Sequence, residues 1–104
     1  MEKLAFRFDS QPVVRAANPA LCGVVGSGNL EILVQPGAEP EVCALSIQTS
    51  ARGFAETWWA VLGSFAASHA AGGTVIAIND MGATPAVVTL RLAQALADYQ
   101  GGAQ

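Results

Sequence analysis

The sequence predicts an α+β protein, a small two-layer sandwich in which two helices cover one face of an antiparallel or mixed sheet of about four to five strands. In the first half, several short segments alternate apolar and polar residues, the period of half-buried strands. In the second half, two segments carry apolar residues at helical spacing, with a short apolar strand between them. The length of 104 residues fits one domain, and we expect residues 1–104 to form it.

Alternating segments of the first half predict the strands. Residues 4–8 alternate apolar with small or basic side chains, and residues 42–49 place three apolar side chains on one face. Residues 20–25 and 30–35 are apolar or alternating, and Gly26-Ser27-Gly28-Asn29 separates them. Two strands on either side of a glycine-rich segment predict a β-hairpin with the serine near its tip.

The second half changes to helical spacing. The stripe of an amphipathic helix is formed by Phe54, Trp58, Val61, Leu62 and Phe65. Gly72-Gly73 has the composition that ends such a helical region. Residues 75–78 are apolar on both faces, which predicts a central strand covered on at least one side.

A turn and a second helix complete the chain. Residues 79–83 have turn composition. Thr84 and Pro85 predict the N-cap and the first residue of a helix, because a proline at that position loses no helical hydrogen bond. The apolar spacing continues to Tyr99, and Gly101-Gly102 is expected to stop the helix. These patterns do not fix the order of the strands in the sheet.

Composition restricts the class of function. The formal net charge is −3 and the five Lys and Arg residues are scattered, so we expect no nucleic-acid binding. No apolar run approaches the ~18 residues that cross a bilayer, and the N-terminus lacks a secretory apolar region, so we expect a cytoplasmic protein without membrane contact. Only 12% of the residues are charged, which favours a subunit of a larger assembly.

Cysteine and histidine offer little chemistry. Cys22 and Cys43 fall in apolar segments, and both are interpreted as small buried side chains. A disulfide between them is geometrically feasible, but nothing suggests an oxidising compartment. With His69 as the single histidine, no tetrahedral metal site can be assembled, and His69 is expected near the end of the first helix.

Charged and aromatic residues elsewhere carry weaker signals. Glu31, Glu56 and Asp80 show no pairing in the sequence and are expected to be solvated. Trp58 belongs to the apolar stripe of the first helix, whereas the adjacent Trp59 is turned away from it. For Trp59, a contact with a partner protein and ordinary packing at the edge of the core are equally good interpretations.

Ser27 stands out because Gly26 and Gly28 on either side of it carry no side chains. Such a tripeptide by itself is most often a plain turn. A catalytic serine would need an adjacent base and a third orienting group, and no G-x-S-x-G motif is present, so no catalytic residue is assigned. The glycine spacing also fits no phosphate-binding loop. The sequence still allows Ser27 to be a residue to which another group is attached, because an external transferase can supply the base.

Three segments together resemble a known family. Val24-Val25-Gly26-Ser27-Gly28-Asn29-Leu30-Glu31-Ile32-Leu33 looks like the prosthetic-group segment of malonate decarboxylase acyl carrier proteins, the delta-type subunits. Gln48-Thr49-Ser50 and the segment from Asp80 to Val88, which contains Gly82-Ala83-Thr84-Pro85, resemble two further segments of that family. The order and spacing match over nearly the whole chain.

The resemblance implies a non-catalytic carrier subunit of a biotin-independent malonate decarboxylase. In this family a serine, here Ser27, carries phosphoribosyl-dephospho-CoA through a phosphodiester, with Gly26, Gly28 and Asn29 in the flanking turn. The thiol of that arm would hold acetyl and malonyl thioesters. The implied partners are the acyl transferase and decarboxylase subunits and the transferase that attaches the prosthetic group.

Two alternative functions also fit the residues, and the chain differs from the family at one position of the serine segment. A carrier of a citrate-lyase-like complex has a similar serine segment, and a scaffold subunit with an unmodified Ser27 would also fit the residues. The family usually has Asp where this chain has Asn29. Asn makes the same local turn bonds without the charge, so a transferase that contacts the carboxylate would bind this chain differently.

Overall fold

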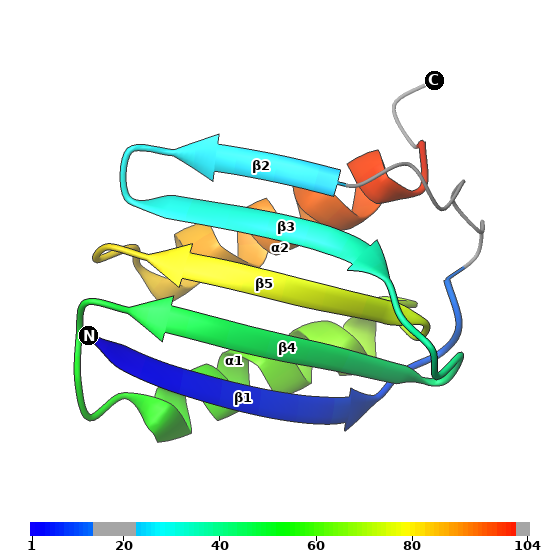
Figure 1. The fold of residues 1–104 in the computed structure, drawn as a ribbon, viewed down its shortest axis with the longest axis horizontal. Coiled ribbons are helices and arrows are strands. Elements are labelled where there is room, and N and C mark those ends of the chain that lie inside the picture. Colours follow the sequence, from blue (N-terminus) through cyan, green and yellow to red (C-terminus); the bar gives the residue numbers. More distant parts are fainter. Residues whose placement is uncertain (14–22, 102–104) are drawn as a thin grey trace.

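The computed structural model describes residues 1–13 and 23–101, and it contains one sheet with two helices behind it (Figure 1). In chain order the elements are β1 (Glu2–Asp9), β2 (Gly23–Ser27), β3 (Leu30–Pro36), β4 (Val42–Thr49), α1 (Ala55–Ser68), β5 (Thr74–Asp80) and α2 (Pro85–Tyr99). The five strands and the helical layer confirm the expected α+β sandwich.

The sheet is mixed, with the strand order β1-β4-β5-β3-β2. β4 and β5 are parallel, because α1 connects them as a crossover, and the other three pairings are antiparallel. β5 lies in the centre, which confirms the prediction for residues 75–78. The strand is longer than expected. Asn79 and Asp80, which have turn composition, continue it because both pair in register with β3 and β4.

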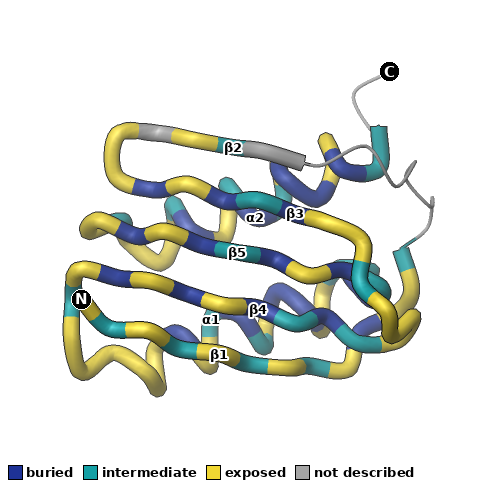
Figure 2. Tube along the Cα trace, in the orientation of Figure 1, coloured by how far each residue is buried: buried dark blue, intermediate teal, exposed yellow. Residues whose placement is uncertain are grey.

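The hydrophobic core fills the space between the sheet and the helices. Burial alternates along β3, β4 and β5, so that one face of each strand is covered and the other is open (Figure 2). Leu62 and Phe65 of α1 and Leu92 of α2 are almost completely buried against this face. Cys43 is also fully buried there and is a free thiol, as expected, whereas Cys22 lies outside the described residues.

The end of α1 differs from the sequence prediction. α1 stops at Ser68, and His69 is its C-cap, with an extended backbone. The Gly72-Gly73 pair comes after that end and has another role. A Cβ atom at Gly72 would lie 2.5 Å from the carbonyl oxygens of Ser10 and Pro40, so glycine is required there by the close approach of other backbone segments. The prediction that this pair ends α1 was therefore wrong.

The second helix follows its prediction closely. Thr84 is the N-cap of α2, and its Oγ1 accepts a hydrogen bond of 3.3 Å from the main-chain N–H of Val87. Pro85 is the first helical residue. Gly101 follows the helix with a φ of +70°, which favours glycine, while Gly102 lies outside the described residues.

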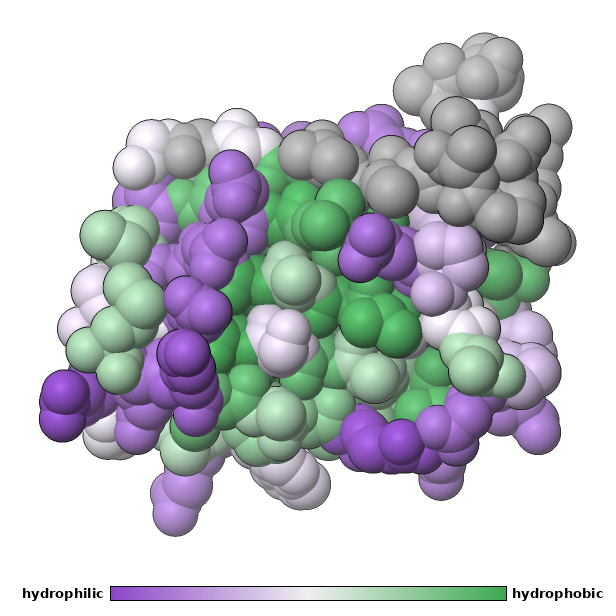
Figure 3. Space-filling model, viewed as in Figure 1, coloured by the Kyte–Doolittle hydropathy of each residue, from purple (hydrophilic) through white to green (hydrophobic). Residues whose placement is uncertain are grey.

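The face of the sheet opposite the helices is open and carries mostly small and apolar side chains at its centre. Figure 3 shows this face, with a hydrophobic area over the middle of the sheet and polar groups at both ends of the strands. Ala44, Val75, Ala77 and Leu33 are partly or fully exposed there. At one end of this face, Asn79 Nδ2 donates a hydrogen bond of 3.2 Å to Glu31 Oε1.

Candidate functional site

The serine segment forms a tight hairpin at the edge of the sheet. Ser27 is the last residue of the edge strand β2 and pairs with Leu30, the first residue of β3. Gly28 and Asn29 alone form the turn between them. The predicted hairpin is confirmed, with the turn one residue beyond Ser27. Of Ser27 the structure describes the backbone, and its cross-strand partner Leu30 is buried on the helix-covered face.

The glycines beside Ser27 are not required by backbone conformation. Neither Gly26 nor Gly28 has a φ in the left-handed region, in contrast to Gly82 with a φ of +106°. A Cβ atom built at Gly26 or Gly28 would meet no described atom within 4 Å. Alanine would therefore fit at both positions. What these glycines provide is unobstructed access to the main chain on either side of Ser27.

The hairpin is bonded to the loop that precedes α2. The main-chain N–H of Met81 donates a hydrogen bond of 2.9 Å to the carbonyl oxygen of Asn29. Leu30 also pairs with Asp80, the last residue of β5. The serine turn, the end of β5 and the start of α2 thus lie at the same end of the strands (Figure 1). The resemblance to a known family also rests on these two segments, although more than fifty residues separate Ser27 from Asp80 along the chain.

Asp80 is the residue that shapes this loop, and the expectation that it is solvated was wrong. Its side chain is only 4% exposed. Thr49 Oγ1 donates a hydrogen bond of 2.8 Å to Asp80 Oδ2, and the main-chain N–H groups of Gly82 and Ala83 donate to Asp80 Oδ1 over 3.3 and 2.8 Å. These donors compensate for the burial of the carboxylate. They also connect the end of β4 to the loop before α2.

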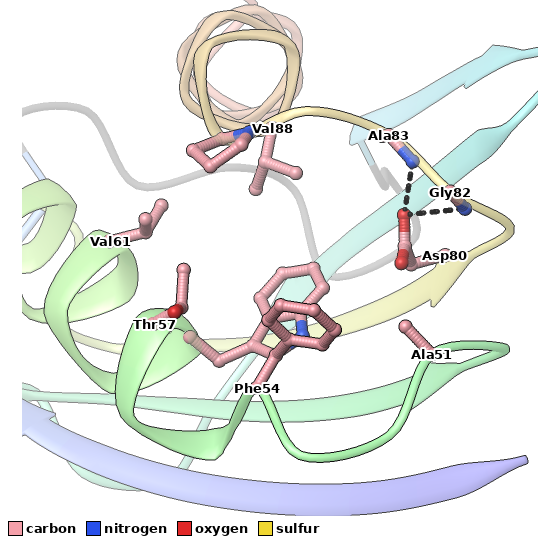
Figure 4. A pocket seen from close by; sticks show the side chains of 10 residues that line it. Ala51, Phe54, Thr57, Val61, Asp80, Gly82, Ala83 and Val88 are labelled. Carbon is pink, nitrogen blue, oxygen red and sulfur yellow. Dashed lines mark hydrogen bonds between the residues drawn. The ribbon is translucent and has the colours of Figure 1, made fainter.

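A pocket of about 250 Å³ opens between the first turns of the two helices, beside this loop (Figure 4). Phe54, Thr57 and Val61 border it from the α1 side, and Val88 borders it from α2. Its remaining lining comes from Ala51, Trp58, Asp80, Gly82, Ala83 and Pro85. The lining is mostly apolar and contains no basic side chain. Sequence reasoning missed this pocket, because it is formed by two segments, residues 51–61 and 80–88, that are distant in the chain.

Of the other residues considered from the sequence, Glu31 lies beside the serine turn, where it pairs with Gly26. His69 follows the far end of α1 and stacks on Phe65, with ring centroids 4.9 Å apart. Glu31 and Glu56 are exposed, as expected. Trp58 is buried and lines the pocket, whereas Trp59 is 60% exposed and lies 6.1 Å from the ring of Phe8.

Two general features of the described residues bear on function. Within residues 1–13 and 23–101, no group of three or more His, Cys, Asp or Glu side chains comes together in a way that could hold a metal ion. Neither of the two described helices combines the length and the apolar character that a bilayer-spanning helix needs.

The fold and the hairpin therefore describe a small α+β protein with one serine turn that is open at an edge of the sheet. Comparison with known proteins identifies the class. Residues 17–99 match the model of the malonate decarboxylase delta subunit family. Since this match covers most of the chain, the protein belongs to that family.

Individual relatives support the same assignment. The chain is 50% identical over 101 residues to a malonate decarboxylase acyl carrier protein of Acinetobacter calcoaceticus, covering 97% of this chain and 99% of the relative. It is 53% identical over 102 residues to the protein of the same name from Xanthomonas euvesicatoria pv. vesicatoria, with 97% of each chain covered.

One solved structure is also similar in fold. A chain of a Pseudomonas malonate decarboxylase hetero-tetramer in complex with malonate matches with a TM-score of 0.77 and 34% identity, covering 95% of this chain and 99% of that chain. The relatives and this structure span nearly the full length of the sequence.

Proposed function

We propose that this chain is the acyl carrier subunit of a malonate decarboxylase complex, and that Ser27 is the attachment point of phosphoribosyl-dephospho-CoA. The observation that carries the proposal is the position of Ser27 in a protein of this family. It ends an edge strand, next to a two-residue turn with open space on both sides. When bound, the prosthetic group supplies a thiol that holds acetyl and malonyl groups as thioesters.

The residues around Ser27 fit a bulky phosphodiester. A Cβ at Gly26 or Gly28 would be sterically permitted, so the absence of side chains there serves access rather than folding. A transferase and its donor can reach the main chain of an edge strand from outside the sheet, because no further strand among the described residues pairs with β2. The hairpin is short and held by the Asn29–Met81 hydrogen bond, so the attachment point has a defined position.

Histidine, the most common general base, lies too far from Ser27 to activate it. The single histidine, His69, follows the last residue of α1, whereas the serine hairpin lies at the end of the strands where α1 begins (Figure 1). A helix of 14 residues spans about 21 Å, which is far beyond hydrogen-bond reach. A base of the transferase would accept the Ser27 hydroxyl proton. The Oγ–P bond would form as the leaving group of an activated donor departs with the bonding electrons.

The carrier acts by position rather than by catalysis. A tethered thioester is presented to successive active sites at a high effective concentration, with no need for diffusion of a free acyl-CoA. The acyl transferase and decarboxylase subunits would perform the chemistry. The open sheet face, with its small and apolar centre, is a surface suited to burial against such subunits.

Intact mass spectrometry tests the proposal. The full-length chain is produced together with its native biosynthetic enzymes, beside a Ser27→Ala variant and a Ser46→Ala control, whose serine is exposed on the open face of β4. We expect the mass of one prosthetic group on the wild type and on Ser46→Ala, and no added mass on Ser27→Ala. An unmodified wild type, or an unchanged added mass on Ser27→Ala, would contradict the proposal.

The same preparation separates the two remaining alternatives. A scaffold subunit would stay unmodified under all conditions. A citrate-lyase-like carrier would be modified at Ser27 but would support turnover of citrate, and not of malonate, in the assembled complex. We expect turnover of malonate only.

A further inference from the structure

The apolar pocket between the first turns of α1 and α2 is separate from the serine turn at which the prosthetic group is proposed to be attached. We propose that it receives the acetyl-thioester end of the arm carried by Ser27 and does not receive the malonyl form. This inference rests on the proposed function. It assigns to the carrier a second site, which would shelter the acetyl thioester from water while the arm is between partner subunits.

The pocket lies within reach of the serine hairpin. Its wall includes Gly82 and Ala83, in the loop whose Met81 N–H is bonded to the carbonyl oxygen of Asn29. Asp80, on the same wall, pairs directly with Leu30, the cross-strand partner of Ser27. Two strand spacings of about 4.8 Å, roughly 10 Å in total, separate β2 from β5. An arm built from a phosphoribosyl group, a nucleotide and a pantetheine chain is longer than this separation.

The shape and the lining favour a small apolar group. A cavity of about 250 Å³ is smaller than the sites of drug-sized ligands, but it can hold the last few atoms of an acylated thiol chain. The methyl groups of Val61 and Val88 face it from the two helices, and the ring of Phe54 borders its mouth (Figure 4). Phe54 is 51% exposed in this structure and would lose apolar exposure on contact with an acetyl group.

Charge selects between the two acyl groups. Malonyl carries a carboxylate at its end, and no lysine, arginine or histidine lines the pocket to pair with it. The carboxylate that is present, Asp80, already accepts hydrogen bonds from Thr49, Gly82 and Ala83. Burying a second negative charge beside it is unfavourable. The malonyl form would therefore stay outside the pocket, available to the decarboxylase subunit.

Methyl NMR on the full-length carrier tests this occupancy. The acetyl-loaded carrier, with its load verified by intact mass, is compared with Ser27→Ala. We expect shift changes at the methyl groups of Val61 and Val88, nuclear Overhauser contacts between them and the acetyl methyl, and no change at Val75 on the open sheet face. With a malonyl load, the Val61 and Val88 shifts should return to those of Ser27→Ala.

Filling the pocket supplies a second measurement. Ala83→Leu places a larger side chain in the lining, and Ala60→Leu makes the same change at an exposed position of α1 outside it. Burying one methyl group changes an equilibrium constant, here that of pocket occupancy, by about fourfold. We therefore expect hydroxylamine to cleave the acetyl thioester about two- to fourfold faster in Ala83→Leu than in the wild type or in Ala60→Leu. Ala51→Leu, in another part of the lining, should behave like Ala83→Leu and replaces it if that variant does not fold.

The outcomes separate the two proposals. A carrier that shows the added mass but no change at Val61 or Val88, and equal cleavage rates in all variants, would overturn the pocket assignment while the attachment at Ser27 stands. Equal shifts for acetyl and malonyl loads would overturn the selection by charge. A carrier without added mass would instead contradict the attachment itself.

Discussion

The main-chain N–H of Met81 donates a hydrogen bond of 2.9 Å to the carbonyl oxygen of Asn29, and this bond joins the serine hairpin to the loop before α2. On one side of the bond lies the proposed attachment residue, and on the other lies the wall of the apolar pocket. The two segments that resemble the family most clearly therefore lie side by side at one end of the strands. Because the bond uses main-chain atoms, it persists when the side chain of Asn29 or Met81 changes.

Gly28→Ala should show whether Gly28 is needed for the transferase to reach Ser27 or for the protein to fold. The φ of Gly28 is not in the left-handed region and its Cβ would meet no described atom, so we expect unchanged stability or a gain of up to about 1 kcal/mol. The rate at which the transferase modifies Ser27 should fall by about an order of magnitude, because a side chain now stands beside the reacting group. Urea unfolding and a time course of intact mass measure the two effects. Ala38→Ser, in the exposed loop at the opposite end of the strands, should change neither stability nor the modification rate. An unchanged modification rate in Gly28→Ala would show that the glycine is not needed for access.

Asp80→Ala should destabilise the protein by about 2–4 kcal/mol in urea unfolding. The substitution removes the acceptor for the hydroxyl of Thr49 and for the N–H groups of Gly82 and Ala83, and leaves these groups without their partner. Glu56→Ala removes an exposed carboxylate from α1 and should change stability by no more than about 0.5 kcal/mol. Equal effects of the two substitutions would mean that the bonds of Asp80 contribute little.

The adjacent tryptophans should differ sharply. Trp58 is 7% exposed and Trp59 is 60% exposed, so Trp58→Ala should cost about 3–5 kcal/mol of stability and Trp59→Ala about 1 kcal/mol or less. Thermal or urea unfolding measures both. A contact of Trp59 with a partner subunit remains a prediction. If a Trp59→Ala carrier assembles into the complex with unchanged affinity, packing against Phe8 is the remaining role of Trp59.

Burial raises the pKa of the Cys43 thiol above its ordinary value of 9.0, although a hydrogen bond from Thr74 acts in the opposite direction. As pH rises through that ordinary value, the thiol in the unfolded chain loses its proton and the thiol in the folded chain keeps it. The unfolded state then binds fewer protons, so the free energy of unfolding falls with increasing pH.

In a Cys22→Ser background, we expect stability to decrease between about pH 8 and about pH 10 more steeply than in the same background with Cys43→Ala. Urea unfolding at the two pH values measures the difference. Parallel pH profiles of stability in the two proteins would contradict the raised pKa of Cys43. In the folded protein at neutral pH, Cys43 should also react slowly with iodoacetamide, since the thiol is both protonated and inaccessible.

Local patterns in the sequence predicted most of the elements. Residues 42–49 place Cys43, Leu45 and Ile47 on one face, and β4 has these bounds. Thr84 and Pro85 specify the start of α2 through side-chain and ring chemistry that acts within one turn, and the structure confirms both. The hairpin at Ser27 was predicted for the same reason, since its strands are adjacent in the chain.

The features that depend on distant segments were not predictable in this way. Asp80 has turn composition, but its burial depends on Thr49, which lies on a neighbouring strand. Gly72 resembles a helix stop, but its role is the close approach of Ser10 and Pro40. The strand order and the pocket between the helices likewise arise from packing that no local pattern encodes.

The most direct test of the attachment site is peptide mapping of the modified carrier. Trypsin cleavage after Arg15 and Arg52 releases residues 16–52, which contain Ser27 together with Ser46 and Ser50. The account predicts that this peptide alone carries the mass of the prosthetic group, and that fragmentation places the mass on Ser27. A modified Ser46 or Ser50, or a modification on any other peptide, would contradict it.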